Sequence, residues 1–374
     1  MHNNDFPKIL WLKECCREHL PRVGGKNVGL GEMIQAGVRV PSGFAVTTDT
    51  YVDFINKAGI NKKINEILST VVVNDIESEE KASEEICRLM ESAPLPVDKE
   101  DAIVSAYNAL CEECDIDDVP VAVRSSATAE DLPGASFAGQ QETYLWVRGA
   151  SEVVKHTIKC WASLFTSRAI SYRLRMGFPH EKVSISVGVQ KMVNARAAGV
   201  AFTLNPATGD RSKIAIECNW GLGESIAQGE VTPDEFLVDK VTRDILRRTI
   251  SEKTVEYAVD AVNSRVVRQE VPRERRNLPC VSDEEILEIA NLARSIERHY
   301  GRPQDIEWAV DNDLPFPNNV IILQSRPETV WSNRQTGPVL QPKASVLEYI
   351  VDNLIAGKHA DIAGADASGG RRQG

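Results

Sequence analysis

The stretch from Val121 to Thr143, VAVRSSATAEDLPGASFAGQQET, constrains the fold of this chain most. It opens with alternating apolar residues, which predict a β-strand, and then reaches Arg124 and a run of hydroxyl side chains. Between Gly134 and Gly139 the residues are small except for Phe137. A cation, hydroxyl donors and glycines that let backbone N–H groups approach closely are what a polyphosphate needs. The alternative is a strand that ends in an ordinary Gly/Ser/Pro loop.

The net charge narrows the classes of partner. The sequence has 43 basic and 54 acidic residues, which gives a net charge of −11. An acidic surface repels phosphate backbones, so we expect neither nucleic acid nor an anionic membrane as a partner. The first residues, MHNNDFPKILWLKECC, lack a cationic head followed by an apolar core. No apolar run approaches the ~20 residues of a membrane span, and we therefore expect a cytoplasmic protein.

A second glycine-rich stretch, VGGKNVGLGEM, begins at Val23. It fits a dinucleotide-binding fingerprint only loosely, because Ile34 stands where a third glycine is needed, and it is no P-loop, because Asn27 follows Gly25 and Lys26. A glycine turn that leads into a helix would place Lys26 near the helix N-terminus, where its charge and the backbone donors attract anions. A purely structural turn is the alternative.

Apolar spacing predicts several helices. Residues 50–118 are mostly helical by pattern, and residues 153–176 have the pattern of one long helix. Ser282 is expected to begin a helix that ends at Tyr300, because Glu285 completes a capping box with it.

Alternating stretches predict strands between and after these helices. Residues 183–193 alternate as a strand, and residues 199–206 supply its expected hairpin partner. The cysteine pair at 111 and 114 is expected to be free thiol, because a zinc site needs four ligands.

The most informative strands are residues 304–311 and 320–326, which alternate and are joined by a Pro/Asn/Asp stretch, so they predict a hairpin. If the last residue of the first strand pairs with the first residue of the second, Glu307 lies opposite Gln324. One face then carries a carboxylate, an amide oxygen and the Arg326 guanidinium. The two oxygens suit Mg²⁺ and the guanidinium suits a phosphate. A surface ion pair is the alternative for an isolated hairpin.

Together these stretches resemble the nucleotide-binding domain of the phosphoenolpyruvate synthase and pyruvate phosphate dikinase family, from about residue 6 to about residue 332. The resemblance implies an α+β ATP-grasp fold in which two lobes close on ATP, with a helical insertion in the N-terminal half. The lobes would comprise residues 1–190 and 191–332. Residues 333–374 would form a linker, a short amphipathic helix and a disordered tail. The stretch GLGESIAQG from Gly221 also resembles the family, but its glycines need no more than a tight turn, and we assign it no role.

The resemblance also implies a site for ATP and Mg²⁺. Glu307 and Gln324 would hold the metal, and Arg124 and Arg326 would act catalytically on the phosphates. The loop from residue 127 to 141 would cover the nucleotide. The hinge residues 190–193 would hold the adenine edge, although Met192 is equally compatible with core packing. The full set of expected nucleotide contacts is Lys26, Arg124, Ser125, Thr128, Gly134, Gly139, Gln140, Gln190, Met192, Val193, Glu307, Gln324 and Arg326.

Full-length dikinases carry a phosphorylated histidine in a Thr-Ser-His type motif, and none of the six histidines here has that context. We therefore expect the ATP-binding subunit of a split dikinase, with the histidine and the acceptor site on a partner subunit. That histidine would attack the β-phosphate and release AMP, and the γ-phosphate would then leave as phosphate. The ATP-binding subunit of phenylphosphate synthase is similar, which favours phenol as acceptor. A split or truncated phosphoenolpyruvate synthase acting on pyruvate and a non-catalytic nucleotide sensor are the alternatives.

Overall fold

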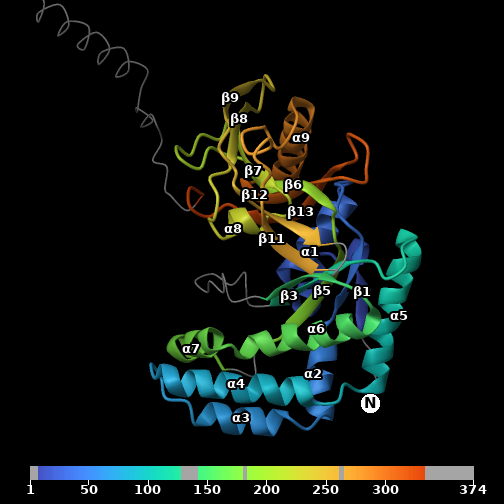
Figure 1. Cartoon of the computed structure of the whole chain (residues 1–374). Helices are drawn as coiled ribbons and strands as arrows, with labels where there is room; N and C mark the ends of the chain where they lie inside the picture. The colour runs from blue at the N-terminus through green and yellow to red at the C-terminus, as the bar shows by residue number, and fades with distance from the viewer. Residues whose placement is uncertain (1–6, 128–141, 180–182, 261–264, 333–374) are drawn as a thin grey trace, which may run out of the picture. The chain divides into compact units, whose positions relative to one another are not determined.

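The computed structural model describes residues 7–127, 142–179, 183–260 and 265–332. Residues up to Glu328 form one compact unit. This unit contains a five-stranded sheet, a six-stranded sheet and a two-stranded ribbon, together with the helices that cover them (Figure 1). The predicted α+β composition is therefore confirmed. Within these described ranges, no helix is both long and apolar enough to span a bilayer.

The five-stranded sheet is antiparallel and has the order β1-β2-β5-β3-β4. Alternation along β3 divides its side chains between two faces, because successive residues of a strand point to opposite sides. Val121 and Val123 lie in the helix-covered core, whereas Ala122 and Arg124 belong to the other face. The strands are β1 Ile9–Trp11, β2 Gly43–Val46, β3 Val121–Ala127, β4 Thr143–Val147 and β5 Ile185–Lys191.

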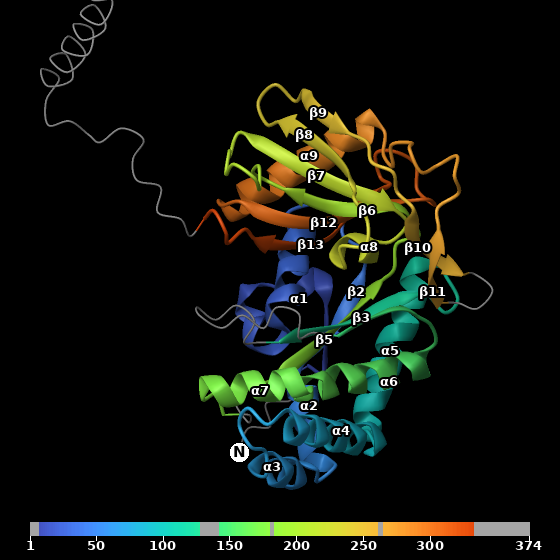
Figure 2. The same cartoon turned by 60° about the vertical axis from the view of Figure 1, so that its left-hand side comes forward.

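Helices cover the outer face of this sheet (Figure 2). In the core beneath them, Trp161 and Phe54 stack with 5.2 Å between their ring centroids. The predicted helical character of residues 50–118 is confirmed. The predicted single helix over residues 153–176 is wrong, because a 3-10 turn, η3 Ser163–Phe165, interrupts it and the hydroxyl of Thr166 accepts from the N–H of Ala169 to cap a new helix. The helices are α2 Thr48–Lys57, α3 Asn61–Ser69, α4 Ile76–Ser92, α5 Val97–Cys114, α6 Ala150–Ala162 and α7 Ser167–Met176.

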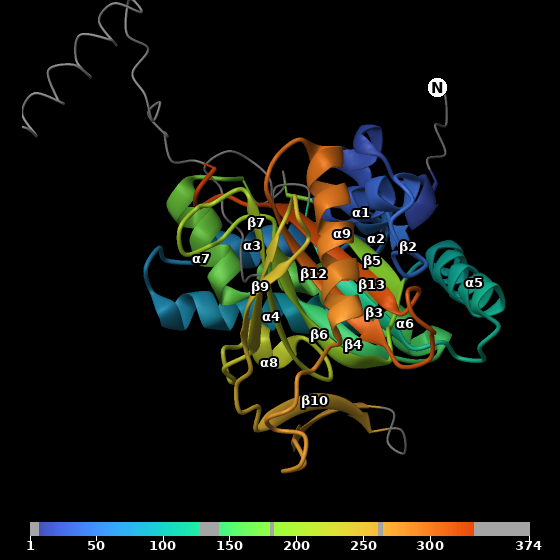
Figure 3. The ribbon, with the colours of Figure 1, turned by 90° about the horizontal axis from the view of Figure 1, so that it is seen from above.

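The six-stranded sheet has the order β13-β12-β6-β7-β8-β9, and all its pairs are antiparallel. Helix α9, Asp283–Tyr300, lies across one face of it (Figure 3). The predicted capping box is confirmed, because Ser282 Oγ accepts from the Glu285 N–H and the Glu285 carboxylate accepts from the Ser282 N–H. The strands are β6 Ala195–Phe202, β7 Lys213–Trp220, β8 Asp234–Asp239, β9 Ile245–Thr249, β12 Gln304–Asp311 and β13 Val320–Pro327.

The predicted hairpin between residues 183–193 and 199–206 is wrong. Strand β5 lies between β2 and β3 in the five-stranded sheet, whereas β6 lies between β12 and β7 in the other sheet. Only Met192 to Asn194 separate the two strands along the chain. Each strand has partners on both sides that are distant in sequence, so no edge is left for the two to pair.

Helix α1, Leu20–Gln35, contacts both sheets. Its early residues Val23 and Val28 pack in a small cluster with Leu10 and Ala45 of the five-stranded sheet. Its later residues Leu30 and Met33 are buried in the core of the six-stranded sheet, together with Leu12 from the 3-10 turn η1 Leu12–Glu14. The helix therefore belongs to both cores.

The ribbon consists of β10 Val255–Asp260 and β11 Arg265–Glu270. It contacts β4 of the five-stranded sheet through β11 and lies beside the four-residue helix α8, Glu224–Ala227, through β10. Gly221 forms a parallel bridge with Tyr257 of the ribbon. The ribbon thus contacts elements that adjoin both sheets.

Candidate functional site

The predicted pairing of Glu307 with Gln324 is confirmed. The expected pairing of residue 311 with Val320 is wrong, because Val310 is the partner of Val320. A β-bulge between Glu307 and Trp308 accounts for both results. It places one extra residue on β13, which offsets the one-residue difference at Val320 and leaves Glu307 opposite Gln324.

Arg124 of the five-stranded sheet reaches this hairpin of the six-stranded sheet. Its Nη2 donates to the amide oxygen of Gln324 and lies 3.8 Å from Oε2 of Glu307. The Arg124 side chain is only 17% exposed, and its buried Nε has no hydrogen-bond partner within the described part of the chain. Arg124 of the glycine-rich stretch therefore meets Glu307 and Gln324 of the hairpin, although Arg124 and Gln324 are 200 positions apart in the sequence.

Glu224, the first residue of α8, faces the same place and was missed by the sequence analysis. Burial raises the pKa of its carboxyl above the ordinary value, and the nearby carboxylate of Glu307 raises it further, whereas the Arg124 guanidinium lowers it. Its buried Oε2 has no hydrogen-bond partner among the described residues. Nothing in the sequence singled out Glu224, because a tight turn explains the glycines before it. Gly221 does have this structural role, since a Cβ there would lie 2.2 Å from the carbonyl oxygen of Tyr257. A carboxylate directly after such a turn is the signal that would have found it.

Arg326 lies two residue pairs beyond Gln324 along the hairpin and is opposite Asp305. Its Nε is 3.7 Å from Asp305 Oδ2, and its side chain is 63% exposed. Burial raises the pKa of the Asp305 carboxyl, and the Arg326 charge opposes that change. The Oδ1 atom of Asp305 is buried and has no partner in the described ranges. Asp305 thus adds a further carboxylate to this face.

Lys26 follows a break in α1. Gly24 has φ 72° and ψ 167°, so the helix begins afresh immediately after it and Lys26 lies in the first turn of the new segment. Its Nζ is 3.5 Å from the carbonyl oxygen of Ser125, the neighbour of Arg124 on β3. The Ser125 hydroxyl is buried and donates to the carbonyl oxygen of Glu142 at 3.3 Å, so it holds the strand in this structure.

The predicted adenine contacts lie where the chain leaves the five-stranded sheet. Gln190 is buried and donates to the Pro41 carbonyl at 3.4 Å. Met192 packs with Ala122 and Leu222, and its N–H donates to the carbonyl of Pro120. The Val193 carbonyl accepts from Ala195, and its side chain packs with Ala198, Ala309 and Ile321. Met192 and Val193 therefore contribute to apolar packing as well as to the link between the sheets. The other predicted contacts, Thr128, Gly134, Gly139 and Gln140, lie outside the described residues.

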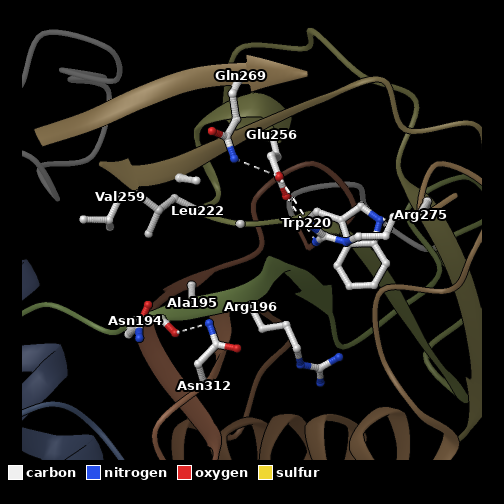
Figure 4. A pocket seen from close by; sticks show the side chains of 12 residues that line it. Asn194, Ala195, Arg196, Trp220, Leu222, Glu256, Val259, Gln269, Arg275 and Asn312 are labelled. Atoms are coloured by element: carbon white, nitrogen blue, oxygen red, sulfur yellow. Dashed lines mark hydrogen bonds and ion pairs between the residues drawn. The ribbon is translucent and has the colours of Figure 1, made fainter. Parts of the chain in front are cut away.

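A separate cavity of about 420 Å³ lies beside the ribbon, and the predicted nucleotide residues do not line it (Figure 4). Arg275 lies over the ring of Trp220 at 4.4 Å, and its guanidinium is 3.3 Å from the buried carboxylate of Glu256. Gln269 donates to the same carboxylate at 3.1 Å. The charged side chains that line this cavity are therefore paired, Arg275 with Glu256 and Arg196 with Glu285 of α9, and we assign the cavity no role.

Cys218, Asp234 and Cys280 form another buried cluster with metal-ligating atoms within 4.8 Å of one another. The ammonium of Lys253, fully buried, lies 2.6 Å from Oδ1 of Asp234. The N–H of Cys280 donates to the other carboxylate oxygen at 3.0 Å. A cation of the chain already neutralises this carboxylate, so the cluster is a buried ion pair rather than a metal site.

The sequence matches the family described as "Pyruvate phosphate dikinase, AMP/ATP-binding domain" over residues 20–345. The chain belongs to this family. It is 46% identical over 359 residues to a probable phosphoenolpyruvate synthase of Staphylothermus marinus, a match that covers 90% of this chain and 43% of that protein. It is 45% identical over 358 residues to the phosphoenolpyruvate synthase of Aeropyrum pernix, covering 89% and 44%. It is 48% identical over 321 residues to a probable phosphoenolpyruvate synthase of Archaeoglobus fulgidus, covering 86% and 41%.

The chain spans less than half the length of these relatives. It is an ATP-binding domain of the phosphoenolpyruvate synthase and pyruvate phosphate dikinase family, and the predicted family resemblance is confirmed. None of the three relatives named here is a phenylphosphate synthase, so that finer resemblance stays a prediction.

The residues that meet between the two sheets, Arg124, Glu307 and Gln324, fit a magnesium ion and a phosphate chain. Carboxylate and amide oxygens are the ligands that Mg²⁺ takes in proteins, and Glu307 and Gln324 offer one of each. Buried polar atoms without partners are rare in folded proteins, and Arg124 Nε, Glu224 Oε2 and Asp305 Oδ1 are three such atoms among the described residues. A polar ligand at this place would give them partners.

Proposed function

We propose that this face binds Mg–ATP and orients it for a dikinase reaction in which ATP gives AMP and phosphate. The observation that carries the proposal is the meeting of Arg124 with Glu307 and Gln324, because it joins a phosphate-binding cation to two oxygen ligands across the two sheets. Phosphoryl transfer depends mainly on positioning and on neutralising charge, and these side chains supply both.

We propose an ATP-grasp arrangement in which the two sheets are the two lobes. Two facts support it. Each sheet has its own large apolar core, and the chain passes from one to the other through Met192 to Asn194. Arg124 contributes from one sheet and the β12–β13 hairpin from the other, so nucleotide bound between them would contact both lobes.

The residues have distinct proposed roles. Glu307 and Gln324 would hold Mg²⁺, which supplies charge neutralisation to the phosphate oxygens when it is bound. Lys26, Arg124 and Arg326 would bind phosphate oxygens, for which a guanidinium offers paired N–H donors. The Gln324 oxygen that accepts from Arg124 fixes the direction of that guanidinium before any ligand arrives.

The proposed nucleophile is a histidine on another domain, carried by a partner subunit. Among the described histidines, His19 bonds to Cys16, His156 packs against Tyr144, and His299 packs against Tyr300. None of these contacts involves Arg124 or the hairpin. Pyruvate is the favoured final acceptor because the three relatives are named phosphoenolpyruvate synthases. Phenol, the acceptor that the sequence resemblance favoured, becomes the alternative, and a nucleotide sensor without turnover is the alternative of a different class.

The test is calorimetric titration of the whole chain with ATP, with and without Mg²⁺, followed by an assay of AMP. We expect Mg-dependent binding, no AMP from the chain alone, and AMP once the histidine-bearing partner is added. Failure to bind ATP in the presence of Mg²⁺ would refute the proposal. Binding without AMP in the presence of the partner would favour the sensor.

A further inference from the structure

The break in α1 at Gly24 brings the turn that carries Lys26 against β3. A Cβ at Gly24 would lie 2.3 Å from Oγ and 2.5 Å from the carbonyl oxygen of Ser126, so only glycine permits this approach. The positive φ of 72° also favours glycine. The new helical segment therefore begins two residues along β3 from Arg124.

Asn27 is next to Lys26 in this first turn and is only 2% exposed. Its carboxamide bonds to the earlier part of α1 and to β5, and through a serine hydroxyl it is linked to β2. Its Nδ2 donates to the Val23 carbonyl across the break at 2.8 Å and to the hydroxyl of Ser186 on β5 at 3.2 Å. Ser186 in turn donates to the carbonyl of Val46 on β2 at 2.7 Å. One carboxamide thus joins both sides of the helix break to the sheet.

The fit of Asn27 against β5 is close. A Cβ at Gly188 would lie 2.4 Å from Oδ1 of Asn27, so any side chain there would displace the carboxamide. Gly188 is the register partner of Arg124 on β3. The carboxamide of Asn27 therefore lies against Gly188, the residue of β5 that pairs with Arg124, and so it is close to the place where Arg124 meets the β12–β13 hairpin.

We propose that Asn27 is a positioning residue that fixes Lys26 beside Arg124 for binding phosphate; this inference rests on the proposed function. A lysine side chain is long and loses rotamer entropy when it is fixed in one position. Anchoring its backbone turn to β5 restricts where the ammonium can lie before the nucleotide binds, and such preorganisation raises affinity without a direct contact. Asn27 itself is buried and bonded within the chain.

A double-mutant cycle separates positioning from a purely structural role. The variants are Lys26→Ala, Asn27→Ala and the double variant, each titrated with Mg–ATP and melted. Thr157→Ala is the matched control, because the Thr157 hydroxyl is also buried and donates to a helix carbonyl at 2.8 Å, far from this face in α6. Ser186→Ala is a milder second variant, which removes the acceptor of Asn27 and keeps Asn27 in place.

We expect Lys26→Ala to weaken Mg–ATP binding about ten- to a hundred-fold, as for the loss of a bond to a charged group. Asn27→Ala should weaken it about fivefold or more in the wild-type background and less than about twofold in the Lys26→Ala background, since residues that act through one another are not additive. Ser186→Ala should follow the same pattern with a smaller effect. Thr157→Ala should lower the melting temperature without changing affinity.

Equal losses from Asn27→Ala in both backgrounds would overturn the inference and leave the proposed function standing. If Asn27→Ala fails to fold, the same comparison is made with Ser186→Ala, and additivity there overturns the inference too. If Lys26→Ala binds Mg–ATP as the wild type does, the role proposed for Lys26 is itself wrong, and the inference about Asn27 is wrong with it.

Discussion

Replacing Glu307 with glutamine tests the metal placement while changing the fold very little. The carboxylate of Glu307 is 44% exposed and 3.8 Å from Arg124. Arg124 is largely buried, but its contact with Glu307 is long and it keeps its hydrogen bond to Gln324, so the loss of stability should stay within the range of about 0–1 kcal/mol that solvent-accessible ion pairs contribute. Glu307 also raises the pKa of the buried Glu224 carboxyl, and its neutralisation relieves that repulsion. The melting temperature should therefore change by only a few degrees.

The effect on the ligand should be much larger and should depend on the metal. An amide oxygen is a weaker ligand for Mg²⁺ than a carboxylate, because it carries no charge. We expect Glu307→Gln to weaken Mg–ATP binding roughly ten- to a hundred-fold, the range for losing an interaction with a charged group. Binding of ATP without metal should stay the same or improve, because one negative charge next to the phosphates is gone.

Glu235→Gln is a closely matched control. Glu235 lies on β8 of the same sheet, is 43% exposed, and lies 3.6 Å from Arg247. Both variants are titrated with ATP in the presence and absence of Mg²⁺ and melted in parallel. Equal Mg–ATP affinity for the two variants would refute the placement of the metal and reduce the Arg124–Glu307 contact to an ordinary ion pair.

Three further predictions concern charged groups of the same unit. Arg326→Ala should weaken ATP binding roughly ten- to a hundred-fold with an almost unchanged melting temperature, because its side chain is 63% exposed; calorimetry beside a melting curve measures both. Burial raises the folded pKa of Glu224 above its ordinary 4.5, so its ionisation costs stability as the pH rises above that value. Glu224→Gln should therefore melt higher than the wild type at pH 8 but not at pH 4, and an equal gain at both would contradict this. Lys253→Met should lower the free energy of unfolding in urea by about 3–5 kcal/mol, because it leaves Asp234 buried without its ammonium; a loss below 1 kcal/mol would contradict the pairing.

The sequence predicted the strands of the candidate site better than it predicted how the strands pair with one another. Alternation identified residues 304–311 and 320–326 as strands, because it is a local pattern. The pairing of Glu307 with Gln324 was inferred from an assumed pairing of residue 311 with Val320, and it holds only because a bulge shifts the register. Alternation gave no sign of the bulge, which adds one residue to β13 next to the Glu307–Gln324 pair. The hairpin between β5 and β6 failed for a related reason. Alternation identifies a strand but not its neighbours, and both strands have partners far away along the chain.

The missed residue and the missed helix break have other causes. Glu224 follows glycines that a tight turn already explains, so nothing in the pattern demanded a further role for the carboxylate. The break before Thr166 depends on a single hydroxyl that caps the second helix, whereas apolar spacing continues across it. The burial of Glu224 and the helix break both depend on tertiary contacts, and the periodicity of apolar residues does not predict tertiary contacts.

The shared helix α1 has a consequence for dissecting this protein. The boundary expected after residue 190 separates the two sheets along the chain, yet Leu30 and Met33 come from the N-terminal side of that boundary and are buried in the six-stranded sheet's core. A fragment that begins at residue 191 would expose the apolar surface these side chains cover, and a fragment that ends at 190 would carry them into water. Each piece would lack part of its interior, and the two would have to be produced together and complement each other to give a native assembly.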